Sequence, residues 1–525
     1  MGKKTIRIKE IPLTTEGFQA ACTLIEEGLK RNRISREIAS ETMLVFEALF
    51  HSLTEQRFEQ DLLLTVRVQR SFGELHIKLG FEGKPYIPIE NVPEDASPEA
   101  SILRAYNDKI AYRYSAGYNS IRIVVRRNYS SYQLSCFAGI LLAILAWLPI
   151  RAGVSADAQL AIEARFVYPL IKLFSNAMLM VGAPITLFSM IKNLTDIYII
   201  AERNSSGRRL QAKTFLTSGV SVALALGTSF LALLLFRDRA GYLAGFGTAM
   251  PLPEVIASLV PYNILAPFET FMPFPMILVA LLITYAFCSV GEYFDLIKKA
   301  VNICYALFSK MLNVVMSALP FFCFLAMLTP LLTGGFAHLR LIVAVVLLLI
   351  VSLIVMIAFY LVRLLIGGVK LGAFLKRLPP LIRENLKINS AIDAVPYNIR
   401  YCARYYGFDR KRLTEKLPIL AQTNLDGNCF LVMMIAMLLI FGMEIETSWL
   451  QILVIAILVL FLSFGAPGQP GGILIGTLII LCYLKAEDLI SIAIYFEVFF
   501  GALQNLVNVV GDIVTVAIEE QKLRP

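Results

Sequence analysis

Two short polar stretches decide how the last third of this chain folds: Asn424-Leu425-Asp426-Gly427-Asn428 and Asn508-Val509-Val510-Gly511-Asp512. Each stands in an apolar run that reads as a membrane span, where an ionisable side chain costs about 3 kcal/mol unless it faces a partner, an ion or water. Each carboxylate has an asparagine and a glycine nearby, and such oxygen-rich surroundings suit a small hard cation. We therefore predict a cation site at membrane depth that includes Asp426 and Asp512.

A simpler interpretation is open for both acids. Each could be a structural carboxylate that pairs with an arginine or lysine of another span. The asparagine and glycine that accompany both acids favour the cation site over this alternative. Asp393 and Glu497 lack such matching neighbours, so a substrate contact and a structural charge are equally open for them.

The composition indicates an integral membrane protein preceded by a more polar domain. Of the 525 residues, 57% are hydrophobic, well above the roughly 45–50% of soluble proteins. About two-fifths of the charged residues lie in the first 133 positions, so we predict a cytoplasmic domain at 1–133 and a membrane domain at 134–525. The net charge of +9 comes from basic loops between spans, which indicates topology rather than a nucleic-acid partner. Contact with anionic membrane lipid is a minor alternative.

Apolar runs of sufficient length predict eight membrane spans. They lie at about 134–150, 166–192, 214–236, 264–288, 303–333, 340–366, 415–440 and 489–515. Basic loops alternate along the chain so that both termini are expected in the cytoplasm, with the protein in the plasma membrane. The amino terminus has no apolar core, so no cleaved signal peptide is expected. The eight scattered cysteines lack the spacing of a disulfide framework or a zinc site.

Two further segments, 372–412 and 449–484, do not have the pattern of ordinary spans. The first contains Asn389-Ser390, and the second contains Pro467-Gly468-Gln469-Pro470-Gly471-Gly472, through which a helix cannot continue. Irregular backbone at membrane depth has to be covered by protein or line a wet cavity, so we predict two re-entrant hairpins; the alternative for the second is a solvent loop. A hairpin followed by an interrupted span occurs twice, which is typical of an inverted-repeat secondary transporter.

These motifs resemble those of the dicarboxylate/amino acid:cation symporters, the family that includes the glutamate transporters. The stretch 424–428 looks like the family's Asn-Met-Asp-Gly-Thr, and 508–512 looks like its Asn-Val-x-Gly-Asp. Residues 463–472 are similar to its second hairpin tip. The resemblance implies a glutamate-transporter-like fold, a homotrimer, and an elevator-like movement of a transport part, for which we expect 372–520 together with part of the third and sixth spans.

The resemblance also implies a division of the binding site. One sodium ion would be held by Asn424, Asn508 and Asp512, and another by Asp426 together with Thr217 and Ser218. A further ion would lie under the backbone between Ser463 and Ala466. The implied substrate region comprises Ser390, Asn428, Gly465, Gly468, Gly501, Gln504 and Asn505.

The substrate positions depart from the family pattern. Gly501 stands where the amino acid transporters have an aspartate for the substrate amine, and Gln504 stands where members for acidic substrates have an arginine. Glutamine cannot form the charged bidentate clamp of an arginine. The first hairpin tip keeps a single serine, Ser390. An acidic amino acid is therefore a poor expectation, and the site suits a small polar solute such as a dicarboxylate or a neutral amino acid.

Residues 1–133 alternate strands and helices in an order that predicts a two-layer α+β sandwich. The order resembles the ATPase domains of anti-sigma-factor serine kinases in the GHKL superfamily. Glu47 matches that family's helix glutamate, but His51 replaces its magnesium-binding asparagine, and Phe81 stands at its adenine-binding aspartate. The lid segment 99–102 lacks the glycines that bring backbone amides close to phosphate. We therefore expect no nucleotide hydrolysis and consider a docking site for a cytoplasmic protein partner.

The sequence as a whole predicts secondary active symport driven by Na⁺ or H⁺. It predicts no enzyme activity, no cofactor, and no metal besides the coupling ion. The rival hypothesis is a transporter-like sensor that binds solute and signals through residues 1–133, and the altered substrate positions motivate it. An enzyme that uses the amino-terminal ATPase fold is disfavoured because the motif residues are missing.

Overall fold

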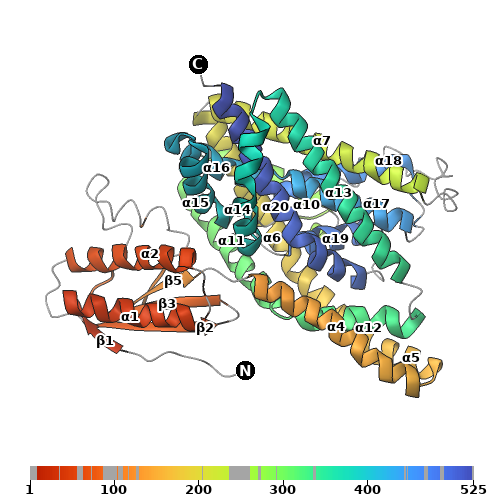
Figure 1. Ribbon diagram of the computed structural model, residues 1–525, viewed down its shortest axis with the longest axis horizontal. Coiled ribbons are helices and arrows are strands. Elements are labelled where there is room, and N and C mark those ends of the chain that lie inside the picture. Colours follow the sequence, from red (N-terminus) through yellow and green to blue (C-terminus); the bar gives the residue numbers. More distant parts are fainter. Residues whose placement is uncertain are drawn as a thin grey trace. The chain divides into compact units, whose positions relative to one another are not determined.

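The computed structural model is mostly helical, with one antiparallel sheet near the amino terminus (Figure 1). It describes residues 9–32, 34, 36–55, 63–71, 74–86, 103, 110–115, 117–125, 129–203, 205–235, 260–269, 273–290, 293–334, 339–442, 445, 447–465, 471–484 and 490–522. The chain divides into two compact units, Met1–Asn128 and Tyr129–Pro525. Each unit has a hydrophobic core of its own.

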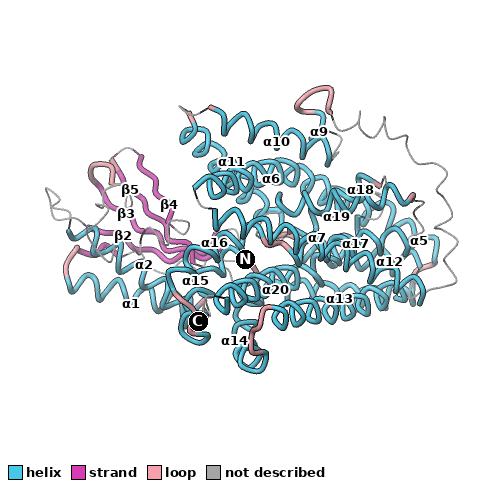
Figure 2. Tube along the Cα trace, turned by 90° about the horizontal axis from the view of Figure 1, so that it is seen from above, coloured by secondary structure: helices cyan, strands magenta, loops and turns pink. Residues whose placement is uncertain are grey.

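The first unit is built on an antiparallel sheet with the strand order β1-β2-β3-β5-β4. The strands are β1 (Lys9–Pro12), β2 (Leu63–Ser71), β3 (Glu74–Glu82), β4 (Ile110–Ser115) and β5 (Tyr118–Val125). Two helices, α1 (Thr15–Arg31) and α2 (Arg36–Glu55), pack on the sheet (Figure 2). Residues along β5 alternate between buried and more exposed, as expected for a strand with one face on a core. The alternation of strands and helices in this unit also predicts a helix at 98–109, of which only Leu103 is described.

Phe81, the residue that the resemblance compares with an adenine-binding aspartate, belongs to this core. Phe81 is buried, and its ring centroid lies 6.2 Å from that of Tyr86. The hydroxyl of Tyr86 lies 2.6 Å from that of Ser52. Glu47 and His51 are exposed, and the predicted lid at 99–102 lies outside the described residues. Phe81 is therefore part of the hydrophobic core of the first unit.

The second unit is helical throughout its described parts. Its helices are α4 (Tyr129–Gly153), α5 (Ala156–Ile162), α6 (Tyr168–Arg203), α7 (Ser205–Leu235), α9 (Ala266–Glu269), α10 (Pro273–Ser289), α11 (Phe294–Met316), α12 (Leu319–Gly334), α13 (Leu339–Ile366), α14 (Leu371–Ile388), α15 (Ala391–Tyr401), α16 (Arg410–Thr423), α17 (Asp426–Gly442), α18 (Trp449–Gly465), α19 (Gly472–Tyr483) and α20 (Ile490–Lys522). Single π-helical turns lie at Glu163–Val167 and Cys402–Tyr406.

Within the described residues, four helical segments are long and apolar enough to cross a membrane. A fifth is added if α11 and α12 form one span, but these two helices meet at a bend of 52°. The sequence predicted an uninterrupted run at 303–333. Pro320 lies in the first turn of α12 and has no amide hydrogen with which to continue the preceding helix. Four shorter apolar helices accompany these segments, and the count of eight spans stays a prediction.

The two polar stretches of the opening motif differ in backbone structure. Asn424 ends α16 and Asp426 begins α17, so the first stretch interrupts the helix, as the sequence predicts. The prediction of an interruption at 508–512 is wrong, because α20 is continuous from Ile490 to Lys522. Gln504, Asn508 and Asp512 are four residues apart, and this spacing places them along one face of a helix. The second stretch is therefore part of a polar stripe and not a break.

The first predicted hairpin corresponds to the helix pair α14 and α15. Asn389 between them has the left-handed backbone conformation, with φ 50°, and the side chain of Ser390 caps α15 by accepting from the amide of Asp393 at 3.2 Å. Asn385 and Asn398 join the two helices by reciprocal side-chain hydrogen bonds of 2.9 and 3.3 Å. The second predicted hairpin corresponds to α18 and α19, whose connection at 466–470 lies outside the described residues.

Candidate functional site

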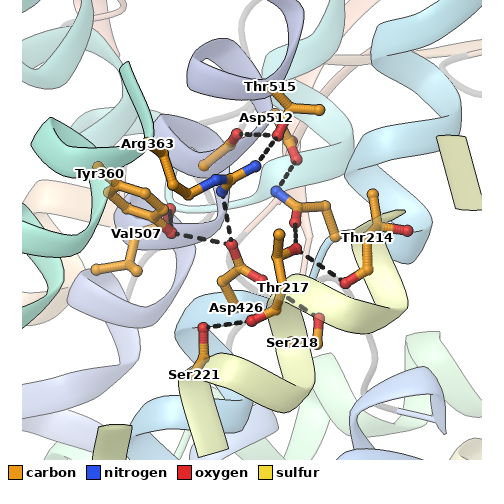
Figure 3. Close-up of polar contacts among 12 residues, drawn as sticks. Thr214, Thr217, Ser218, Ser221, Tyr360, Arg363, Asp426, Val507, Asp512 and Thr515 are labelled. Atoms are coloured by element: carbon orange, nitrogen blue, oxygen red, sulfur yellow. Dashed lines mark hydrogen bonds and ion pairs between the residues drawn. The ribbon is translucent and has the colours of Figure 1, made fainter. Parts of the chain in front are cut away.

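Side chains from α7, α13, α17 and α20 meet at the interruption between α16 and α17 (Figure 3). The amide of Asn424 donates to Oδ1 of Asp512 at 2.9 Å, across 88 residues of sequence. The hydroxyl of Thr217 on α7 donates to Oδ1 of Asn424 at 3.4 Å. Asp426 is 0% and Asp512 is 3% exposed. Both predicted carboxylates are therefore buried beside the same asparagine.

The carboxylate of Asp426 has polar partners from two other helices. The hydroxyl of Ser218 on α7 donates to its Oδ1 at 3.3 Å. On α13, Nη1 of Arg363 lies 3.4 Å from its Oδ2, and the Tyr360 hydroxyl lies 3.5 Å from the same oxygen. The resemblance led us to expect Thr217 and Ser218 near these acids. The resemblance did not predict Arg363, a single arginine near the end of the apolar run at 340–366. The pair is the alternative stated above for Asp426, a carboxylate beside an arginine of another span.

Asn508 caps the interrupted helix. Its Oδ1 accepts hydrogen bonds from the backbone amides of Gly427 at 2.8 Å and Asn428 at 3.4 Å. The first amides of a helix have no partner within that helix, and α17 begins at Asp426. The interruption is thus stabilised from α20, a role that we did not predict from the sequence.

The glycine of each motif allows a close approach between these elements. A Cβ added at Gly427 would lie 2.6 Å from the backbone oxygen of Gln504 on α20. A Cβ added at Gly511 would lie 2.7 Å from the Tyr360 hydroxyl and 2.9 Å from the Asn424 amide nitrogen. All three distances are too short for a real Cβ atom. The two motifs are therefore packed closely against their surroundings. Gly427 leaves room for the backbone of Gln504, and Gly511 leaves room for the side chains of Tyr360 and Asn424.

Most of the described substrate candidates are hydrogen-bonded to other members of the predicted site. Nε2 of Gln504 donates to Oδ1 of Asn428 at 2.9 Å, and Nδ2 of Asn428 donates to the Ser463 hydroxyl at 3.0 Å. Nδ2 of Asn505 donates to Oδ1 of Asn389 at 3.1 Å. The cavity that Asn428 lines measures about 10 Å³, enough for roughly one water molecule. In this conformation the amide groups satisfy one another, and a solute would have to separate them.

Other candidates occupy the surroundings of this network. Gly465 is buried, and a Cβ there would lie 2.9 Å from Cγ2 of Thr186. Ser390 is engaged as the cap of α15. Ala466 and Gly468 lie outside the described residues.

Glu497, one turn before Gly501 on α20, has a structural role. Its two carboxylate oxygens accept from the backbone amides of Gly471 at 2.8 Å and Leu474 at 3.0 Å, at the start of α19. A Cβ added at Gly501 would lie 2.7 Å from the Glu497 carboxylate. Gly501 thus provides the space for Glu497, and the geometry favours the structural interpretation of this acid over a substrate contact.

The donor atoms gathered at the interruption are oxygens of carboxylates, amides and hydroxyls. In the part of the chain that the structure describes, no cluster of three or more His, Cys, Asp or Glu side chains could hold a metal ion. Oxygen ligands suit a hard cation better than a soft metal. The chemistry of the site is therefore compatible with Na⁺ or H⁺.

Residues 133–521 match the sequence model of the sodium:dicarboxylate symporter family. The chain belongs to this family. Its members are transporters and not enzymes, and membership implies cation-coupled symport of dicarboxylates or amino acids by a multi-pass membrane protein. The match includes every residue of the site described above, and the first unit lies outside it. A search among curated proteins found no match to the chain.

Proposed function

We propose that this symporter couples the downhill movement of Na⁺ or H⁺ to the uptake of a small polar organic solute. The observation that carries the proposal is the hydrogen bond of 2.9 Å between Asn424 and Asp512, which joins the interruption before α17 to α20 at two buried carboxylates. The candidate solute residues lie on the same two helices: Asn428 follows Asp426, and Gln504 precedes Asn508 by one turn. Occupancy of one half of the site can therefore alter the other half, as coupling requires.

The proposed cation ligands surround Asn424. Asp512 supplies the charge, and Asn424 and Asn508 are the other proposed ligands. Thr217, Ser218 and Asp426 border this position. Asn428 donates a hydrogen bond to Ser463 at the end of α18, and the backbone between Ser463 and Ala466 is proposed to cover a further ion.

The proposed solute region is neutral. It consists of the amide side chains of Asn428, Gln504 and Asn505, the hydroxyl of Ser390, and the backbone at Gly465 and Gly468. No arginine stands at position 504, so a dicarboxylate would be held by amide donors and helix ends, and a neutral amino acid would meet the same groups. Gly501 contributes no side chain. The space beside it is filled by the Glu497 carboxylate, which binds the amides of Gly471 and Leu474.

We propose that α14–α15 and α18–α19 are re-entrant hairpins within a transport part at 372–520. The second helix of each pair supports this: α15 with the π-helical turn that continues it ends at Tyr406, and α19 has 12 residues. At ~1.5 Å per residue these helices extend only ~24 and ~18 Å, short of the ~30 Å of a bilayer core. The proposed transport step is an elevator-like displacement of this part.

The proposed assembly is a homotrimer in the plasma membrane with both termini in the cytoplasm. The basic loops support this orientation. A cytoplasmic protein partner for the first unit belongs to the same proposal, and the buried Phe81 at the expected adenine position supports a docking role over a nucleotide site.

Uptake into proteoliposomes tests the proposal. The full chain is reconstituted, and uptake of labelled succinate, alanine, serine and glutamine is followed under inward Na⁺ and H⁺ gradients. We expect gradient-dependent uptake of at least one solute, which falls to the level of empty liposomes in Asp512→Asn. Asp196→Asn is the matched control, because Asp196 pairs with Lys192 and Lys298 on α6 and α11, outside the site. A solute that raises the Tm of the protein but never crosses the membrane would instead support the sensor.

A further inference from the structure

Arg363 brings a permanent positive charge to the buried acids (Figure 3). Its Nη1 lies 3.4 Å from Oδ2 of Asp426, and its Nη2 donates to the Thr515 hydroxyl at 2.9 Å. The Arg363 side chain is 15% exposed and that of Asp426 is 0% exposed. A guanidinium group keeps its charge at any physiological pH. The ion pair is therefore a standing feature of the folded protein.

The position of the guanidinium group is well determined by its surroundings. Its carbon lies 5.5 Å from the ring centroid of Phe359 and 5.9 Å from that of Tyr360, within cation–π range. Thr515, which accepts from Nη2, donates in turn to the backbone oxygen of Gly511 at 2.8 Å. The helix that bears Arg363, α13, also packs against α7, α17 and α20. The charge is thus attached to the same group of helices that carries the two acids.

The balance of charge at the interruption leaves one negative charge. When both are ionised, Asp426 and Asp512 contribute two negative charges, and Arg363 contributes one positive charge beside Asp426. Asp512 is hydrogen-bonded to the neutral amide of Asn424. A buried carboxylate is costly without a counter-charge, so a mobile cation is favoured at Asp512, whereas Asp426 already has a counter-ion within the chain.

We propose that Arg363 is a tethered cation that takes the place of a coupling ion at Asp426. The symporter then binds one exchangeable cation at the two acids, next to Asp512, rather than two. This inference rests on the proposed function, because it assumes that Asp512 holds the mobile ion. It makes Arg363 a residue that determines coupling stoichiometry, and it predicts that removal of its charge opens a second cation site.

Sodium itself is the probe in the test. The Tm of the full-length protein in detergent is measured over a range of NaCl concentrations, with choline chloride holding ionic strength constant. Above its dissociation constant, a ligand that binds the folded state raises the free energy of unfolding by the same increment per site for each tenfold rise in its concentration. We expect the rise of Tm per tenfold increase in sodium to be about twice as large in Arg363→Gln as in the unmodified protein. Arg363→Lys keeps the charge and should keep the original slope.

The double variant Arg363→Gln/Asp426→Asn is the matched control. It removes both charges of the pair, so its slope should return to that of the unmodified protein. The inference is overturned if Arg363→Gln has the same slope as this double variant, or if Arg363→Lys also acquires the steeper slope. It is equally overturned if Arg363→Gln is unfolded at every sodium concentration while the double variant folds, because sodium then fails to replace the guanidinium.

The same measurements judge the proposed function separately. Asp512→Asn should abolish the sodium response of the otherwise unmodified protein. If the unmodified protein shows no response but Arg363→Gln acquires one that the double variant lacks, the assignment of Arg363 stands and a sodium site at Asp512 is refuted. If Arg363→Gln acquires none, the inference about Arg363 fails whatever Asp512→Asn does.

Discussion

Glu497 accepts a hydrogen bond of 2.8 Å from the backbone amide of Gly471, and its second carboxylate oxygen accepts one of 3.0 Å from Leu474. These amides stand at the start of α19, where helix amides lack partners within the helix and the helix dipole favours a negative charge. Glu497 itself lies on α20 and is 6% exposed. The start of the second half of hairpin α18–α19 is therefore held by a side chain of another helix.

Glu497→Gln is expected to lower the Tm of the protein. Glutamine offers one acceptor oxygen where the carboxylate offers two, and a buried amide that loses its partner costs about 1–3 kcal/mol. Differential scanning fluorimetry in detergent measures the change. Glu415→Gln on α16 is the control, because Glu415 is exposed. Equal Tm values for the two variants would show that the cap contributes nothing.

Gly501→Ala is expected to destabilise the protein through Glu497. The added Cβ would lie 2.7 Å from the Glu497 carboxylate, which cannot move aside without losing its two amide partners. The effect should disappear when Glu497 is already alanine. A double-mutant cycle should thus give a coupling of about 0.5–3 kcal/mol between the two positions. Additive effects would mean that Gly501 is required for a different reason.

Gly427→Ala should be more damaging than Gly219→Ala, which changes a helical glycine with open space beside it. Its Cβ would lie 2.6 Å from a backbone oxygen of Gln504, and a backbone atom cannot rotate away as a side chain can. We expect a loss of about 1–3 kcal/mol from the forced separation of α17 and α20. Gly219→Ala on α7 is the control, since a Cβ there meets no atom within 4 Å. The prediction fails if both variants have the Tm of the unmodified protein.

The orientation of the membrane domain is testable by cysteine labelling in intact cells. Gly153 and Lys299 are both exposed, and they stand after the first and the fourth predicted span, in connections that the charge pattern assigns to opposite sides. A cysteine at Gly153 should react with a membrane-impermeant maleimide, and one at Lys299 should react only after permeabilisation. The unmodified chain corrects for its native cysteines. Reversed labelling would place the termini outside.

The first unit is expected not to bind ATP. Phe81 is buried against Tyr86 and offers no acceptor to an adenine amino group. Titration of the full-length protein with a fluorescent ATP analogue should therefore give no saturable signal that unlabelled ATP displaces. Displaceable binding would contradict the view of this unit as a docking domain.

The sequence predicts the residues of the site better than it predicts the backbone structure that positions them. Asn424, Asp426, Asn508 and Asp512 stand out because a polar side chain inside an apolar run is conspicuous. The helical spacing of Gln504, Asn508 and Asp512 indicates one face of a continuous helix. The wrong prediction of an interruption at 508–512 follows from the likeness of this stretch to 424–428. The hydrogen bonds of Glu497 and Asn508 to helix amides were not predictable, because the start of α17 and of α19 depends on packing.

The sequence by itself determined which charged and amide groups enter the membrane domain and that a helix ends at Asn424, since these follow from local polarity. Only the tertiary structure decided which charges meet. Arg363 donates to Asp426 across 63 residues of sequence. Nothing in the local pattern of either apolar run indicates that these two residues meet. Ion pairing depends on which helix faces are packed together, and that arrangement is set by the close contacts at Gly427 and Gly511, not by the periodicity of any single segment.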